Sequence, residues 1–143
     1  MKVLVCGDRN WTHKPTIEKV MKKYLSKEDT LIVGGAKGAD WIAEAIGRDV
    51  IGCPVLVFMA NWTKYGRAAG PVRNREMLKQ GPDLVIAFHQ NLEKSKGTAD
   101  TVREARRQRI KVLLISEIIE DRPSAKYERE ALDLRARALN KLK

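Results

Sequence analysis

The amino-acid sequence predicts an α/β domain of the Rossmann-like, doubly wound type, with a mostly parallel five-stranded sheet and flanking helices. Two observations lead to this prediction. Short apolar runs alternate with helical patterns along the chain, which is typical of βαβ units. The runs are also apolar throughout rather than at every second position, as expected of strands covered on both faces. We expect one domain over residues 1–121, followed by a C-terminal amphipathic helix over residues 122–143.

Five strands are expected from runs that are short, rich in Val, Ile and Leu, and bounded by glycine, proline or polar residues. In chain order they cover residues 2–6, 30–33, 54–59, 83–88 and 111–115. The first run ends at Gly7 and the second runs directly into two glycines. Both endings predict a tight turn at the carboxyl end of the strand.

Helices are expected between the strands, where apolar residues recur every three or four positions. They cover residues 15–25, 39–50, 73–79, 99–108 and 124–142. Pro15 suits the first turn of the first helix, and Gly52 suits the end of the second. Residues 60–72 contain two glycines and a proline and are expected to form a long loop, which in a compact domain is usually functional.

Ligands of open parallel sheets bind outside the carboxyl ends of the strands, so the loops there hold the candidate site residues. The loop after the first strand combines glycine, polar and aromatic residues: Gly7, Asp8, Arg9, Asn10 and Trp11. The loop after the second strand places glycines before a helix start, where backbone N–H groups can approach a phosphate: Gly34, Gly35, Lys37, Gly38 and Asp40. Both loops also fit a simpler interpretation as polar turns. In this interpretation, Asp40 only caps the helix that follows the second strand.

The segments after the third and fourth strands add aromatic and basic candidates. Aromatic faces stack on bases, and arginines bind phosphate or carboxylate; the candidates after the third strand are Trp62, Tyr65, Arg73, Asn74 and Arg75. After the fourth strand, glycine and hydroxyl residues again precede a helix: Ser95, Gly97 and Thr98. Two such helix starts on one sheet edge favour a phosphate-bearing ligand, whereas the alternative for the third segment is an ordered surface loop.

The net charge and the arrangement of catalytic residue types distinguish poorly among the possible functions. The chain has 28 Lys and Arg against 18 Asp and Glu, a net charge of +10, which attracts nucleotides, phosphates and nucleic acid alike. No serine, histidine and acid arrangement stands out. The carboxylates near the expected crevice would hold a ribose hydroxyl or act as a base, or serve equally as caps or ion-pair partners: Asp8, Asp40, Glu76 and Asp100.

Cysteine and histidine usage predicts neither a metal site nor a disulfide framework. Cys6 and Cys53 lie in apolar runs and are expected to be buried thiols of a reducing compartment. The two histidines and two cysteines lack the spacing of a zinc site. No apolar run approaches the roughly 18 residues that a membrane span needs, so no membrane association is expected.

Five segments together carry a family resemblance: VLVCGDRNW at 3–11, IVGGAKGAD at 32–40, ANWTKYGRAAGPVRNREML at 60–78, DLVIAF at 83–88 and SKGTAD at 95–100. Over about residues 1–116 the sequence resembles the SLOG superfamily, named for the Smf/DprA and LOG proteins, and within it the YspA-type, cpYpsA-related branch. The resemblance implies a sensor domain that binds a nucleotide or nucleotide-derived ligand of the NAD/ADP-ribose or nucleoside-monophosphate class. It implies no required cofactor, and a place in the cytosol of a bacterium or, for a phage-encoded protein, of its host.

The sequence is more distantly similar to the LOG phosphoribohydrolases, which cleave the N-glycosidic bond of nucleoside monophosphates. Those enzymes carry an arginine four residues before a methionine, and Arg73 stands four before Met77. They also carry an acid three residues after the threonine of a GGxGT motif, whereas this chain has SKGT at 95–98 and Thr101 at the acid's position. The enzyme alternative therefore needs Arg73 with Glu76 or Asp100, and release of free base from AMP or NAD would support it.

A second alternative is single-stranded DNA binding, because the superfamily includes a single-strand DNA protein and this chain is strongly basic. Such binding would fall steeply with salt. The C-terminal helix raises a separate question, since its apolar face would pack either on this domain or on a second copy of the chain, which leaves homo-oligomerisation open.

Overall fold

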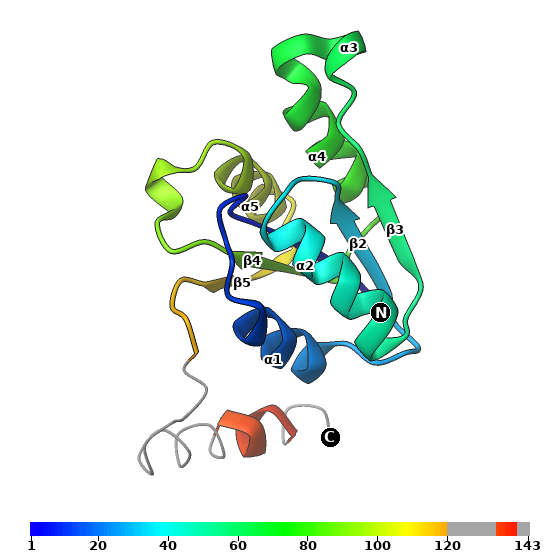
Figure 1. Ribbon diagram of the computed structural model, residues 1–143, viewed down its shortest axis with the longest axis vertical. Coiled ribbons are helices and arrows are strands. Elements are labelled where there is room, and N and C mark those ends of the chain that lie inside the picture. Colours follow the sequence, from blue (N-terminus) through cyan, green and yellow to red (C-terminus); the bar gives the residue numbers. More distant parts are fainter. Residues whose placement is uncertain (120–133, 140–143) are drawn as a thin grey trace.

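The computed structural model describes residues 1–119 and 134–139, and in this part the chain forms a five-stranded, all-parallel sheet (Figure 1). The strand order is β3-β2-β1-β4-β5. The strands are β1 (Lys2–Gly7), β2 (Thr30–Gly34), β3 (Val55–Phe58), β4 (Leu84–Phe88) and β5 (Lys111–Ile115). The predicted α/β fold class and the five strands are therefore confirmed.

Four helical segments connect these strands and cover both faces of the sheet (Figure 1). α1 (Lys14–Tyr24) and α2 (Ala39–Ala45) pack on one face, over a cluster that includes Ile17, Met21 and Ala43. α4 (Ala69–Lys79) and α5 (Gly97–Arg107) pack on the other, where Met77, Leu78, Val102 and Ala105 form part of the second cluster. The inner strands β1, β2 and β4 are buried on both sides, which explains why they are apolar throughout, whereas the edge strands β3 and β5 are partly exposed.

The chain reverses its direction of winding at β1. From β1 it moves outward through β2 to β3, and it then crosses to β4 on the other side of β1 and continues to β5. The loops that leave β1 and β4 therefore diverge to opposite faces of the sheet, so the carboxyl ends of these two strands form the topological switch point. This topological switch point is where ligands of such sheets bind.

The segment 60–72 differs from the prediction, because residues 62–72 are helical rather than part of a long loop. They contain α3 (Trp62–Tyr65), the 3₁₀ turn η2 (Gly66–Ala68) and the first turn of α4. The Asn61 side chain caps α3 by accepting a hydrogen bond from the Lys64 N–H at 3.0 Å. Pro71 lies in the first turn of α4, where its missing N–H costs no hydrogen bond. Of the residues that indicated a loop, Gly66 caps the end of α3, and Gly70 and Pro71 lie in the first turn of α4.

Two further segments depart from the expected helices. The helix expected at 39–50 is α2 followed by a π-helix, η1 (Ile46–Ile51), and it ends at Gly52 in the left-handed conformation. The loop after β4 contains a 3₁₀ turn, η3 (Leu92–Lys94). The helix expected at 124–142 falls mostly on residues outside the described part of the chain; residues 134–139 of it are helical.

The end of α5 carries a strained arginine. Ile110 N–H bonds to the Ala105 carbonyl at 2.9 Å and Arg109 N–H to the Arg106 carbonyl at 3.0 Å, which is the pattern of a Schellman cap. Arg109 occupies the left-handed position of this cap, with φ of 61°, and is the one non-glycine residue of the described chain with positive φ. A side chain there costs about 1–2 kcal/mol relative to glycine.

Both cysteines are free and buried, as predicted. Cys6 lies on β1 under the carboxyl edge of the sheet, and burial raises the pKa of its thiol. Cys53 lies just before β3, and burial raises the pKa of that thiol too.

The segment after β5 is tied to α1 by one buried hydroxyl. Thr16 is fully buried, and its Oγ1 accepts a hydrogen bond from the Ile119 N–H at 2.8 Å while contacting His13 Nδ1 at 2.8 Å. The two residues are 103 positions apart, so this contact holds the chain after the last strand against the first helix.

We expect Thr16→Val to lower the free energy of unfolding by about 1–2 kcal/mol, because it leaves the Ile119 N–H without its acceptor while preserving shape. Urea denaturation measures the loss. Thr12→Val, at an exposed position, is the matched control and should change the free energy of unfolding by less than about 0.5 kcal/mol. Equal midpoints for both variants would contradict a structural role for the Thr16 hydroxyl.

Candidate functional site

Asp8 and His89 meet at the switch point, where β1 and β4 end. Asp8 follows β1 and its Oδ1 accepts a hydrogen bond from the Asn10 N–H at 2.9 Å, which fixes the turn. His89 follows β4, and its Nε2 lies 3.9 Å from Asp8 Oδ2. The Asn91 N–H donates to His89 Nδ1 at 3.0 Å, so in the neutral ring the proton sits on Nε2, toward the carboxylate.

Gly38 brings the loops after β1 and β2 into direct contact. It has φ of 76°, a conformation open to glycine, and a Cβ there would meet the backbone of Asp8 and Arg9. The next residue, Ala39, donates its N–H to the Asp8 carbonyl at 3.1 Å. The glycine predicted to approach a phosphate therefore also locks two loops of the site together.

A carboxylate and a guanidinium face each other over Gly34, at the end of β2. A Cβ on Gly34 would lie 2.5 Å from Arg73 Nη1 and 2.8 Å from Asp40 Oδ2, so a side chain larger than hydrogen would push both groups away. Arg73 comes from α4 and Asp40 from α2, on opposite faces of the sheet. The absent side chain is thus what allows the two charges to approach across the sheet edge.

Asp40 is held in an unfavourable environment. Only 5% of the residue is exposed, its Oδ2 accepts one hydrogen bond from the Ala36 N–H at 3.3 Å, and its buried Oδ1 has no partner within the described residues. Burial raises the pKa of Asp40 to about 6, although the charge of Arg73 and the Ala36 N–H both lower it. The Cys6 thiol lies close enough that the Asp40 charge contributes to its raised pKa.

The Arg73 guanidinium keeps N–H donors that no group of the described chain accepts. Its Nε donates to Asn74 Oδ1 at 3.0 Å and its Nη1 to the Phe58 carbonyl at 3.4 Å. A guanidinium has five N–H donors, and no acid of the described chain lies within ion-pair distance of this one. The remaining donors are therefore free to bind an anion that enters the site.

Asn74 and Asp100 join α4 to the start of α5. Asn74 is buried, and its Nδ2 donates to the Gly97 carbonyl and to Asp100 Oδ2, both at 3.3 Å. Asp100 Oδ2 also accepts from Arg75 Nη1 at 3.4 Å. Thr101, which stands at the position of the LOG acid, is buried and turns its hydroxyl back to the Gly97 carbonyl at 3.3 Å.

The start of α5 is already capped by a side chain. Ser95 Oγ accepts hydrogen bonds from the Thr98 N–H at 3.0 Å and from the Ala99 N–H at 3.2 Å. These are two of the amides that a phosphate at this helix start would use. A ligand phosphate there competes with the Ser95 hydroxyl.

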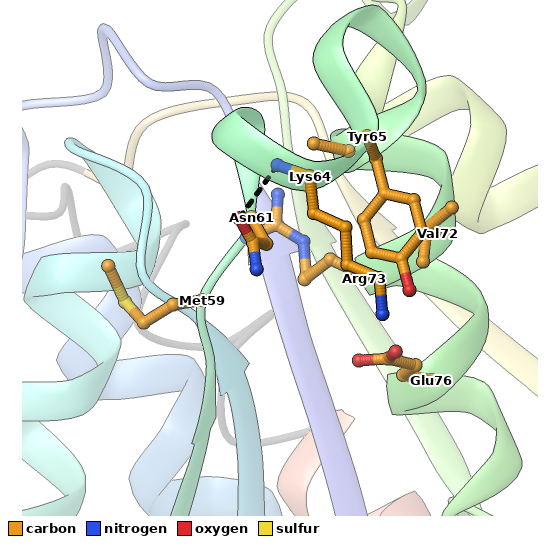
Figure 2. A pocket seen from close by; sticks show the side chains of 8 residues that line it. Met59, Asn61, Lys64, Tyr65, Val72, Arg73 and Glu76 are labelled. Atoms are coloured by element: carbon orange, nitrogen blue, oxygen red, sulfur yellow. Dashed lines mark hydrogen bonds between the residues drawn. The ribbon is translucent and has the colours of Figure 1, made fainter.

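A shallow pocket of about 300 Å³ lies beside Arg73, between the chain after β3 and α4. Figure 2 shows Met59 on one side of it, Tyr65, Val72 and Glu76 on the other, and Arg73 between them. The Lys64 ammonium lies 5.0 Å from the centre of the Tyr65 ring, so this wall is both aromatic and positive.

The structure places most of the predicted site residues at one edge of the sheet, but these residues differ in their exposure to solvent. Trp11 is buried, packs edge-to-face on Phe88 at 5.7 Å, and donates its indole N–H to the His13 carbonyl. Trp62 and Tyr65, by contrast, are 62% and 37% exposed. The exposed members of the predicted set also include Arg9, Asn10, Lys37, Arg75 and Gly97.

Sequence reasoning missed four residues of this region. His89 is not among the predicted site residues, and its approach to Asp8 follows only from the pairing of β1 with β4. The other three line the pocket: Met59, Asn61 and Lys64. Asn61 carried a signal, since an asparagine three residues before the amide it caps is a typical helix start.

The comparisons with known proteins identify the family of this chain. A Rossmann-like sheet whose carboxyl edge carries glycine turns, an arginine and carboxylates defines a ligand-binding α/β domain. The model of the YspA, cpYpsA-related SLOG family matches residues 1–65. The chain is also 34% identical over 119 residues to the Gene 61 protein of Mycobacterium phage D29, covering 78% of this chain and 94% of that protein. The chain belongs to the YspA, cpYpsA-related SLOG family.

Membership of this family indicates a nucleotide-related ligand-binding role. Within the described residues, no helix combines the length and hydrophobicity needed to cross a bilayer. The described residues also contain no cluster of three or more side chains suited to hold a metal ion.

The buried Asp40 makes stability depend on pH. Its folded-state pKa of about 6 lies above the ordinary 3.8, so the folded chain binds this proton more tightly than the unfolded chain does. The free energy of unfolding therefore falls as the pH rises from about 4 to about 6, and it stays low above that. Two other groups face Asp40, the Arg73 guanidinium and the Cys6 thiol, and burial raises the pKa of the thiol further above this window.

We expect Asp40→Asn to raise the free energy of unfolding at pH 8 by about 2 kcal/mol, because it removes the buried charge without changing shape. The gain should shrink toward pH 4. Chemical denaturation at several pH values measures both effects, with Asp49→Asn, at an exposed position, as the control. A loss of stability at pH 8 in Asp40→Asn would show that the ionised carboxylate contributes favourably.

Proposed function

We propose that this chain is a sensor that binds a nucleotide or nucleotide-derived ligand, of the NAD/ADP-ribose or nucleoside-monophosphate class, at the carboxyl edge of its sheet. The observation that carries the proposal is the setting of Arg73. Its guanidinium lies at the sheet edge, is backed by a buried carboxylate over Gly34, and keeps unused donors toward a pocket. A guanidinium in this setting is suited to bind a phosphate through bidentate hydrogen bonds.

The surroundings of Arg73 supply the other contacts that a nucleotide needs. Lys64 adds a second positive charge to the pocket wall. Tyr65 and the exposed Trp62 offer aromatic faces on which a base stacks. At the switch point, Asp8 keeps its Oδ2 facing His89 at 3.9 Å, without a direct hydrogen bond. This oxygen is available to accept a ribose hydroxyl.

Sensing, rather than turnover, fits the start of α5. The position that holds the acid in LOG phosphoribohydrolases is occupied by Thr101, whose hydroxyl is already bonded within the helix. Asp100, one residue earlier, is bonded to Asn74 and Arg75. Because both side chains are already engaged, we assign Thr101 to the first turn of α5 and Asp100 to holding α4 and α5 together, rather than to a glycosidic transition state.

A thermal-shift measurement with AMP, ADP-ribose and NAD tests the proposal. A ligand at about 100 times its dissociation constant adds roughly 2.7 kcal/mol to the free energy of unfolding. We expect a shift with at least one of these compounds and its loss in Arg73→Ala, because the phosphate loses its partner.

The control is Arg48→Ala, which removes an exposed arginine paired with Glu44 within the α2–η1 segment and should keep the full shift. A shift that survives in Arg73→Ala would contradict the role of this arginine. The absence of a shift with all three compounds would contradict the ligand class.

A second candidate function, hydrolysis of the N-glycosidic bond, rests on one observation. Glu76 lines the same pocket as Arg73, one helical turn further along α4, so an arginine and a carboxylate face one space. We expect any release of free base from AMP or NAD to disappear in Glu76→Gln. Base release at the same rate in this variant, or none in the parent chain, would exclude the hydrolase mechanism with this acid.

A further inference from the structure

The outer surface of α4 and α5 carries a dense group of cations on the same face of the sheet. Six of them are exposed, and we refer to them as the arginine face: Arg75, Lys79, Arg103, Arg106, Arg107 and Arg109. Arg75 reaches from α4 to Asp100 on α5, with Nη1 and Oδ2 3.4 Å apart. This ion pair joins the cation-bearing surfaces of the two helices.

Acidic residues neutralise only part of this face. Asp100 pairs with Arg75, and Glu104 pairs with Arg107 at 2.7 Å. The hydrogen bonds from Arg107 and Gln108 lower the pKa of Glu104, so it is ionised and fully engaged. The other four cations have no acid within 4 Å in the described part of the chain. A net positive surface remains after every local pair is counted.

Arg109 occupies a backbone position that favours glycine. It occupies the left-handed position of the α5 cap, with φ of 61°, where glycine is the favoured residue. Strain of this kind persists where the side chain has a use. Arg109 is exposed and follows α5 by two residues, so it adds a cation next to the end of this helix.

The residue types on this face point to phosphate. Arginine binds phosphate through a planar fork, whereas lysine acts as a flexible point charge. On the opposite face of the sheet, the cations of α1 are all lysines and the α2–η1 segment has the single arginine Arg48, so the arginines are not spread evenly. The sequences of α4 and α5 contain no aromatic residue, and single strands are held by stacking bases on aromatic side chains.

We propose that the arginine face binds the sugar–phosphate backbone of a nucleic-acid duplex. Backbone contact is independent of base sequence and needs only charge in a fixed arrangement. The pocket beside Arg73 lies between α4 and the chain after β3, away from α5, so the two sites use different surfaces. This proposal does not depend on the identity of the ligand in the pocket.

Fluorescence anisotropy of a dye-labelled 20-base-pair DNA duplex, titrated with the full chain between 50 and 200 mM salt, tests the proposal. With four phosphate contacts the logarithm of the binding constant should fall with a slope of about −3.6 against the logarithm of salt, or roughly 10²-fold over this range. Arg103→Gln/Arg106→Gln should reduce the slope by about 2 and weaken binding at least tenfold at 50 mM salt.

The matched control removes the same charge from the opposite face. Lys14→Gln/Lys27→Gln, at two exposed positions on and just after α1, should weaken duplex binding less than threefold. Equal weakening in both double variants would overturn the proposal, because the overall charge and not the arginine face would then explain binding. Absence of binding at 50 mM salt would overturn it as well.

Two further arms separate the alternatives. A single strand of the same sequence should bind more weakly than the duplex; tighter binding would overturn the duplex assignment in favour of the exposed aromatics near the pocket. Arg109→Gly should weaken duplex binding about threefold or more while raising the unfolding temperature, since it relieves backbone strain. A variant that is more stable and binds as before would contradict a role for Arg109.

Discussion

The approach of Asp40 and Arg73 over Gly34 is the constraint on which the carboxyl edge depends. One charge comes from a helix on each face of the sheet, and the hydrogen that stands in place of a side chain on β2 lets them meet. Neither group is fully satisfied there. The chain therefore keeps an arginine with unused donors beside a buried carboxylate whose pKa burial raises to about 6, and perturbed pKa values of this kind are common at binding sites.

Much of the fold could be predicted because its signals are local. Five apolar runs identified five strands, and uniform burial of the inner strands explains why these runs do not alternate. The helices at 62–72 were missed, because Gly66 and Pro71 occur both in loops and at helix ends. The π-helix at 46–51 was missed for another reason: its extra residue per turn leaves little trace in a pattern of period 3.6.

The candidate site was predictable as a set of loops but not as a set of contacts. The strand order places the ends of β1 and β4 side by side, and only then do Asp8 and His89 become neighbours. The burial of two tryptophans also could not be predicted from their sequence context. Trp11 packs in the core, whereas Trp62 remains exposed. α4 also separates Arg73, which faces the pocket, from Arg75, which bonds toward α5, because residues two apart on a helix point in different directions.

Cys6 lies on the central strand directly beneath this edge, and burial both hides its sulfur and keeps it protonated. Because the thiolate is the species that reacts, alkylating reagents can modify this position only while β1 is transiently exposed. The rate at which Cys6 is alkylated therefore measures how often the centre of the sheet opens, and the measurement needs no added label. Cys53, nearer the sheet margin before β3, reports on the opening of a different part, so the two sulfurs together can distinguish fraying of one edge from cooperative unfolding.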